Sequence, residues 1–302
     1  MHHNDLMTNP EIFYKYTSSS TALIILKNSR LRWSSPLLFN DPAEFQRMPR
    51  FEPTIAEASK ELPETLLKIA NNKIKFDEST LSPSAKLLLQ RVRVLIEQKT
   101  SDAKIISALT SRNENPDNHV ASGLRSFFGE TFLSTARVIC LTTNHSNDAM
   151  WANYAEGHKG CVLGFRHIPE LSTPFLEAKK VRYSESPPVV GTGLDFLLHG
   201  DTSQLRESTI NAVCYTKKSD WAYEQEWRAI TWRPKEDSQF GDYKFHPNEL
   251  ESITLGSKIL PDTESAIKKL IQGIYPHCNL YRLVIKNGET TRALINHREC
   301  DA

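Results

Sequence analysis

Two glutamates, an arginine and three aromatic rings stand within nine positions at residues 220–228, and such side chains can transfer protons or hold a ligand. This segment continues into residues 229–232, which predict a strand. Successive side chains on a strand point to opposite faces, so Glu224, Glu226 and Arg228 would share one face. Two like charges at this spacing repel each other unless a cation lies between them.

The glutamate pair has two interpretations. In the first, Arg228 and a lysine from Lys217-Lys218 neutralise the two carboxylates, and the pair has a structural role. In the second, the pair faces a cleft and handles a ligand, because carboxylates with perturbed pKa values mark functional sites. In that case Glu226 is the main functional carboxylate, Glu224 assists it, and Arg228 is the structural counter-ion.

Two short strands are expected near the N-terminus. Residues 13–16 predict the first strand, which brings a cation and an aromatic ring, Lys15 and Tyr16, to adjacent positions. Residues 31–33 predict the second strand, after a helix that the Ser and Thr side chains at 17–20 can cap. The chain therefore begins with a strand, a helix and a strand.

A turn with two polar side chains follows the second strand. Asn40 and Asp41 stand before Pro42, and proline pushes the residue before it out of the helical region. Pro42 suits the first position of a helix that carries Glu44 and Phe45. The segment is either a capped turn or part of a binding site, because backbone donors at a strand-to-helix junction favour anionic ligands.

Helical periodicity dominates residues 49–135, which we interpret as a helical insertion within a single domain covering residues 12–302. The best-defined helix is expected at 83–99, and further helices are expected at 57–70 and 102–111. The insertion contains no internal repeat, and we do not expect it to be a separate catalytic unit.

The middle of the chain combines a buried strand with an aromatic helix. Residues 138–143 predict the strand, and a short helix at 148–156 follows it. Trp151 and Tyr154 are three residues apart and share one face of that helix, and His158 comes just after it. Bulky rings on a short helix are most often core, but a tyrosine and a histidine at strand connections are also candidate site residues.

The remaining pattern adds strands and helices in mixed order. Asn287-Gly288 is a strong turn signal, and it joins the two strands of a terminal hairpin. The expected strands are 161–165, 180–183, 253–256, 280–285 and 291–295, and the expected helices are 194–199, 203–215 and one that begins at Pro261.

The composition indicates a globular protein without a strong charge bias. The 302 residues are 39% hydrophobic and 24% charged, and their net charge of +1 predicts no global attraction to nucleic acid or an anionic membrane. The five cysteines are widely spaced, so free thiols are expected instead of a zinc ribbon or a disulfide framework. Residues 1–11 lack a signal core, and no apolar run approaches the ~20 residues that span a bilayer. We expect a cytoplasmic protein without a membrane segment or a metal site.

Four stretches taken together resemble a known family. Their order and spacing are similar to those of a bacterial family, domain-of-unknown-function family 2971, over nearly the whole chain. The family name implies no reaction. The stretches are YKY at 14–16 with residues 31–36, FNDPAE at 39–44, MWANYAEGHKG at 150–160 and DWAYEQEWR at 220–228, and ITLGSK at 253–258 fits the same pattern.

The order of elements also resembles that of ADP-ribosyltransferase-like proteins, and this resemblance implies an α+β fold with a mixed or antiparallel sheet core and a helical insertion. In that superfamily a residue on the first strand holds the nicotinamide nucleotide. An aromatic ring from a middle element stacks on nicotinamide, and a late glutamate orients the ribose or activates the acceptor. The resemblance assigns Lys15 and Tyr16 to the first role, Tyr154 or Trp151 to the second, and Glu226, with Glu224 before it, to the third.

The implied chemistry is cleavage of the bond between nicotinamide and ribose in NAD. Positive charge develops on the ribose, so a carboxylate at Glu226 would stabilise the transition state. Glu224 would deprotonate or position the acceptor, and Lys15 would meet the pyrophosphate. The reaction would be ADP-ribosyl transfer to a protein or nucleic acid, or hydrolysis of NAD, as in a toxin or phage-defence effector. Further candidate nucleotide-binding residues are Asn40, Asp41 and His158.

Two other functions are compatible with the same residues. A non-enzymatic module would form a ligand or partner pocket from Asn40, Asp41, Trp151, Tyr154 and Glu226. A magnesium-dependent nuclease would use carboxylates on the ion, because carboxylates suit magnesium. Its candidate ligands are Asp41, Glu44, Glu224 and Glu226.

Overall fold

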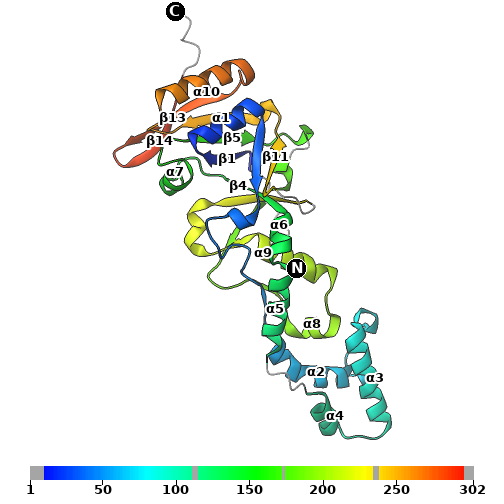
Figure 1. The fold of residues 1–302 in the computed structure, drawn as a ribbon. Coiled ribbons are helices and arrows are strands. Elements are labelled where there is room, and N and C mark those ends of the chain that lie inside the picture. Colours follow the sequence, from blue (N-terminus) through cyan, green and yellow to red (C-terminus); the bar gives the residue numbers. More distant parts are fainter. Residues whose placement is uncertain (1–9, 111–114, 172–173, 234–237, 296–302) are drawn as a thin grey trace, which may run out of the picture. The chain divides into compact units, whose positions relative to one another are not determined.

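The structure is a computed structural model that describes residues 10–110, 115–171, 174–233 and 238–295 (Figure 1). Its internal contacts divide the chain into two compact units. The first, called the sheet unit below, consists of Met1–Asp41, Thr131–Tyr183 and Lys217–Ala302. The second, called the helical unit, consists of Pro42–Glu130 and Ser184–Thr216.

The sheet unit contains a mixed, mostly antiparallel sheet, so the predicted α+β fold class is confirmed. Among its described strands, β12 and β13 are the one neighbouring pair that runs parallel. A second branch starts at β4, where β10 (Glu226–Trp232) pairs with β4 and then with β6 (Lys179–Lys180). Along the main path the order is β11 (Phe240–Lys244), β2 (Arg30–Ser34), β4 (Ala136–Thr142), β1 (Ile12–Thr17), β5 (Cys161–Arg166), β12 (Leu250–Leu255), β13 (Asn279–Lys286) and β14 (Glu289–Leu294).

The strand register places Glu226 and Arg228 on the same face of this sheet as Tyr14. Glu226 on β10 lies opposite Thr142 on β4, and Thr142 lies opposite Tyr14 on β1. Directly opposed residues of antiparallel strands point to the same face. Tyr14, Thr142 and Glu226 therefore share a face, and Arg228, two residues beyond Glu226, shares it too.

Helices cover both faces of the sheet. On one face α1 (Ser19–Asn28) and α10 (Pro261–Ile274) pack over the main apolar core, which includes Phe13, Leu163 and Trp227 (Figure 1). The start of α1 is fixed by Ser18, whose side chain accepts a hydrogen bond from the Thr21 N–H. On the other face α7 (Asp148–Tyr154) packs against β1 through a smaller cluster that contains Tyr14, Tyr16, Met150 and Trp151.

The helical unit is organised around α2 (Ile55–Ala70), which contacts four other helices of the unit. Thr54 and Glu57 form a capping box at the start of α2. Residues 184–216 pack with the region predicted as the helical insertion, and β8 (Val189–Gly191) pairs with β3 (Arg50–Phe51). The other helices are α3 (Pro83–Glu97), α4 (Asp102–Leu109), α5 (Pro116–Phe127), α8 (Gly193–His199) and α9 (Ser203–Cys214), and α6 (Glu130–Thr135) leads into β4.

One helix prediction is wrong. The segment that starts at Pro42 forms a turn instead of a helix carrying Glu44. Phe45 closes the turn in the left-handed region, at φ 61°. A bulky residue rarely adopts this conformation, and no local sequence signal predicts it.

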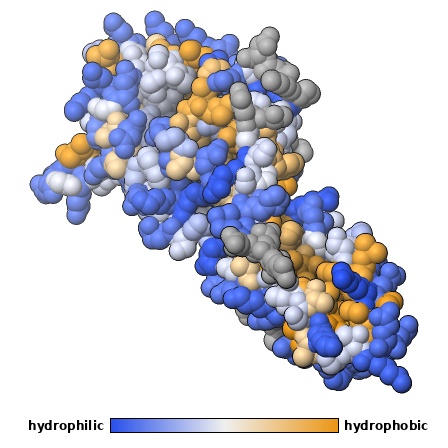
Figure 2. Space-filling model, turned by 60° about the horizontal axis from the view of Figure 1, so that its bottom comes forward, coloured by the Kyte–Doolittle hydropathy of each residue, from blue (hydrophilic) through white to orange (hydrophobic). Residues whose placement is uncertain are grey.

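The surface is a mosaic of polar and apolar residues, as Figure 2 shows for one face. Large apolar side chains are exposed in places, including Leu87 at 67% and Phe127 at 65%. Among the described residues, no helix is both long and apolar enough to cross a bilayer. The described cysteines are free thiols, and Cys300 lies outside the described residues.

Candidate functional site

Four charged side chains of the sheet unit form one cluster, called the ion cluster below: Lys217, Glu224, Glu226 and Arg228. The Lys217 Nζ donates to Glu224 Oε2 at 2.7 Å and to Glu226 Oε2 at 3.3 Å. The Arg228 guanidinium binds the same Glu226 carboxylate, with Nε 2.5 Å from Oε1 and Nη2 2.9 Å from Oε2. Two cations therefore offset two carboxylates.

The ion cluster is buried. Glu226 is 3% exposed, Glu224 is 4% exposed and Arg228 is fully covered. Burying charges costs free energy unless they are paired and hydrogen-bonded, and both conditions hold here. The geometry agrees with the neutralised interpretation of the glutamate pair, with Lys217 as the second cation, and the cluster lies in the interior.

Glu224 and Glu226 contact Lys217 from two different elements, although the strand pattern predicted one common strand. Residues Ser219–Glu224 form a 3₁₀ helix, and β10 begins only at Glu226. Gln225 between them adopts the left-handed conformation, at φ 45°. The expected common strand face for Glu224, Glu226 and Arg228 is therefore wrong for Glu224, which approaches Lys217 from the helical turn.

A hydrogen-bonded path connects the ion cluster to the surface. The Tyr154 hydroxyl donates to Glu224 Oε1 at 2.6 Å. The Asn40 side-chain amide donates to the Tyr154 hydroxyl at 3.3 Å. Asn40 is exposed and Tyr154 is half-buried, so these two residues form the outer end of the path. Asp41 is next to Asn40, and its charge acts on Arg228.

The first-strand candidates, Lys15 and Tyr16, have different surroundings. The Lys15 Nζ donates to the main-chain oxygen of Cys140 at 3.1 Å, and the Cys140 side chain is hydrogen-bonded to Glu226. Lys15 is thus connected to the ion cluster through Cys140. The Tyr16 hydroxyl donates to the Asn144 carbonyl and accepts from the Asn147 N–H, so it anchors the loop before α7.

Trp151 and His158 support the fold around α7. Trp151 is fully buried, and its indole N–H donates to the His145 carbonyl at 3.1 Å. The His158 ring stacks on Trp151 with an interplanar angle of 9°. The His158 carbonyl accepts from the Lys258 N–H, and the neighbouring Gly256 N–H donates to the Gly160 carbonyl. These contacts join the sequence motifs at 150–160 and 253–258, whose backbones cross closely at this point.

Glycine is required at this crossing. A Cβ on Gly256 would lie 2.1 Å from the His158 carbonyl oxygen, and a Cβ on Gly160 would lie 2.2 Å from that of Thr17. Both contacts are with main-chain atoms, which cannot swing aside. The glycines of the motifs at 150–160 and 253–258 therefore have a packing role.

Burial and charge shift several pKa values in the site. Burial raises the pKa of Glu226 to about 7, although the charge of Lys217 opposes the shift. Burial lowers the pKa of Lys217, but the charges of Glu226 and Glu224 outweigh burial and raise it above its ordinary value. The pKa of the Tyr154 hydroxyl is raised by burial and by its hydrogen bond to Glu224.

The ion cluster can hold and move protons, but it is a poor cation site. Its carboxylates already have Lys217 and Arg228 as partners, so little negative charge is left for magnesium. In the part of the chain that the structure describes, no group of three or more His, Cys, Asp or Glu side chains is placed to hold a metal ion. Glu44, the fourth proposed magnesium ligand, belongs to the helical unit.

Three side chains around Glu226 were not singled out as site residues from the sequence. The sequence indicates Lys217 only as a counter-ion, and it places Cys140 and Tyr183 only within expected strands. The Tyr183 hydroxyl accepts a hydrogen bond from the Glu226 N–H at 2.8 Å. The one available signal was the lysine pair before residues 220–228, which is next to two glutamates in need of a cation.

Comparison with known proteins gives a family match for part of the chain. Residues 150–229 match the model of a family described as "Protein of unknown function (DUF2971)". The match begins in α7 and ends within β10, so it includes Tyr154, Lys217, Glu224, Glu226 and Arg228. No curated protein and no solved structure matches the chain.

Proposed function

We propose that the sheet unit binds NAD and cleaves its nicotinamide–ribose bond, passing ADP-ribose to a macromolecular acceptor or to water. The observation that carries the proposal is the polar path from Asn40 through Tyr154, Glu224 and Lys217 to Glu226. This path joins predicted site residues from separate segments of the chain. The path runs from the exposed Asn40 amide to the buried Glu226 carboxylate. A site that receives a ligand from solvent needs such a connection to the surface.

In this proposal Glu226 stabilises the positive charge that develops on the ribose. A carboxylate held away from water by its neighbours interacts more strongly with such a charge than a solvated one. Lys217 and Arg228 hold both oxygens of Glu226 and fix its direction. A pKa of about 7 would let Glu226 exchange a proton near neutral pH.

Tyr154 and Glu224 act on the two sides of the reacting bond. The hydrogen bond to Glu224 fixes the Tyr154 ring, so its face can hold the leaving nicotinamide. Glu224 positions or deprotonates the acceptor. Lys15 meets the pyrophosphate, and Asn40 and Asp41 contact the nucleotide at the surface. A cytoplasmic enzyme of this kind would deplete NAD or modify a protein or nucleic acid, as a toxin or phage-defence effector does.

A second candidate is a ligand-binding module without turnover. The observation that favours it is the two-point contact of Arg228 with Glu226 inside a buried, charge-balanced cluster. In such a module the ion cluster holds the fold in place. Asn40, Asp41 and Tyr154 contact the ligand at the surface.

The test is incubation of the full chain with NAD labelled in the nicotinamide ring, with released nicotinamide as the readout. Wild type should release nicotinamide, and Glu226→Gln should be slower by about a hundredfold or more, as is found when one transition-state contact is removed. Glu289→Gln is the matched control, because Glu289 is an exposed glutamate of the same unit. It should react like wild type.

Other results separate the candidates. If NAD is neither consumed nor bound, the proposal is abandoned. If NAD is bound but not consumed, and Tyr154→Phe weakens binding, the module is favoured. Magnesium-dependent nuclease activity that disappears in Glu226→Gln would favour the nuclease instead.

A further inference from the structure

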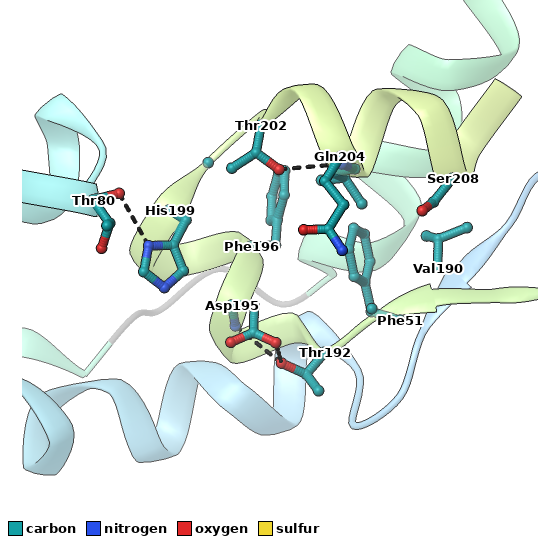
Figure 3. A pocket seen from close by; sticks show the side chains of 13 residues that line it. Phe51, Thr80, Val190, Thr192, Asp195, Phe196, His199, Thr202, Gln204 and Ser208 are labelled. Carbon is teal, nitrogen blue, oxygen red and sulfur yellow. Dashed lines mark hydrogen bonds between the residues drawn. The ribbon is translucent and has the colours of Figure 1, made fainter. Parts of the chain in front are cut away.

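The helical unit contains a cavity of about 440 Å³, lined by residues of β3, β8, α8 and the start of α9 (Figure 3). Its volume lies in the range of small-molecule sites, roughly 300–1,000 Å³. None of the residues assigned to the candidate functional site lines it. The lining side chains used below are Phe51, Asp195, Phe196, His199, Gln204 and Ser208.

Two aromatic rings and an amide occupy the middle of the cavity wall. The rings of Phe51 and Phe196 are 5.1 Å apart between centroids, with an interplanar angle of 36°. Figure 3 shows the Gln204 side chain pointing toward the Phe51 ring. Within the described part of the chain, neither the Gln204 amide nor the Ser208 hydroxyl has a protein hydrogen-bond partner, so both are available to a ligand. A planar ring could contact the phenylalanines while Gln204 binds its edge.

His199 is a ring whose position in the lining is fixed by two contacts. Its Nδ1 lies 3.0 Å from the Thr80 carbonyl oxygen, which can only accept, so Nδ1 carries the proton. The Nε2 of the neutral ring is then an acceptor. The imidazole also stacks on Phe76 with an interplanar angle of 10°, and this contact holds its orientation.

The charges of the lining exclude one large class of ligands. Among the described residues that line the cavity there is no lysine or arginine, and Asp195 is the one carboxylate. Asp195 Oδ2 accepts from the Thr192 hydroxyl at 2.7 Å. Anionic groups would therefore meet a carboxylate and no cation. N–H donors of a ligand, in contrast, would find acceptors at Asp195, His199 and Gln204.

We propose that this cavity binds an uncharged aminopurine base of the adenine type. The purine ring lies against Phe51 and Phe196. The Gln204 amide offers one donor and one acceptor, and this pair matches the N7 acceptor and the N6 amine of adenine. The base-binding site belongs to the helical unit and does not depend on the proposed reaction in the sheet unit.

The experiment is calorimetric titration of the full chain with adenosine, which carries the base without a phosphate. Wild type should bind adenosine, and Gln204→Ala should weaken binding by about tenfold, the loss expected for a hydrogen-bonded pair. Gln90→Ala is the matched control, because Gln90 is an exposed glutamine on α3 of the same unit and does not line the cavity. Inosine has an oxygen in place of the exocyclic amine and should bind more weakly than adenosine.

Three results would overturn the proposal. These are no binding of adenosine, equal affinity of wild type and Gln204→Ala, and equal affinity for adenosine and inosine. Glu226→Gln separates this site from the proposed NAD site, and it should leave adenosine affinity unchanged. If Glu226→Gln abolishes adenosine binding and Gln204→Ala does not, the ligand binds in the sheet unit and the cavity proposal fails.

Discussion

At the scale of single residues, Lys217 is the side chain on which the ion cluster depends. Its ammonium contacts both Glu224 and Glu226. It is also 4.7 Å from the centroid of the Trp221 ring, a distance at which a cation is attracted to the ring face. Removing this charge would leave Glu224 with the Tyr154 hydroxyl as its partner in the contacts described above.

We therefore expect Lys217→Met to destabilise the protein strongly. Removing one partner of a buried ion pair typically costs about 3–5 kcal/mol, because the remaining charge is uncompensated. The adjacent Lys218 is a matched control: it is 53% exposed and paired with an exposed Asp220. Lys218→Met should change the free energy of unfolding by less than about 1 kcal/mol.

The measurement is urea unfolding of both variants followed by circular dichroism, with the free energy of unfolding taken from midpoint and slope. Equal destabilisation by the two substitutions would contradict the assigned role of Lys217. A loss in nicotinamide release that exceeds the loss of folded protein would in addition support Lys217 as a residue that positions Glu226.

In the ion cluster, the sequence predicts the charges but not the position of each side chain. The charges in 220–228 and their need for a cation were predicted from residue types, and Lys217 supplies it. The position of Glu224 could not be predicted, because it depends on the left-handed conformation of Gln225. Glutamine rarely adopts that conformation, and only the surrounding contacts stabilise it.

At the scale of elements, patterns of apolar and β-branched residues located the strands well. Residues 138–143 and 161–165 correspond to β4 and β5, and Asn287-Gly288 does join β13 and β14. These signals are local, because each depends on neighbouring residues. The packing of residues 184–216 with the earlier helices was not predictable, because it joins segments that are far apart in the sequence.

Another contact between distant segments of the helical unit caps α2. The Asp117 carboxylate, in the first turn of α5, accepts hydrogen bonds from the Ile55 N–H at 2.8 Å and the Ala56 N–H at 2.9 Å. These N–H groups are in the first turn of α2 and have no partner within that helix. A carboxylate at this end also interacts favourably with the helix dipole. Asp117 therefore ties two helices of the helical unit together.

Asp117→Ala should destabilise the helical unit by about 1–3 kcal/mol, the usual effect of losing hydrogen bonds to a charged group at a helix start. Asp102→Ala is the control, because Asp102 is an exposed aspartate in the first turn of α4, another helix of the same unit. Amide hydrogen exchange in α2 reports the change locally. Unchanged protection of the Ile55 and Ala56 amides in Asp117→Ala would show that the carboxylate does not cap α2.

At the scale of the molecule, the sheet connects segments from the whole length of the sheet unit. The central strand β1 comes from the start of the chain, and its neighbours β4 and β5 come from the middle. The core on the α1 and α10 face continues through β12 and β13 near the end. Such non-local pairing predicts that this sheet opens cooperatively, because the order of its strands differs from their order in the chain.

Two buried thiols of the sheet unit can test this cooperativity. Cys161 on β5 is fully buried, and Cys278, just before β13, is 2% exposed. Burial raises the pKa of each thiol to about 12, and only the thiolate reacts with an alkylating agent. Neither cysteine should react in the native state, and both should become reactive only when the sheet opens.

We expect pulse labelling with iodoacetamide, read site by site by mass spectrometry, to modify Cys161 and Cys278 at the same slow rate. Both rates should rise together with urea and approach the rate of the unfolded chain, which is the control for intrinsic reactivity. A cooperative sheet requires this match, because Cys161 lies on β5, Cys278 lies just before β13, and both belong to the same apolar core. Labelling of one cysteine at low urea while the other stays protected would show that the sheet opens in parts.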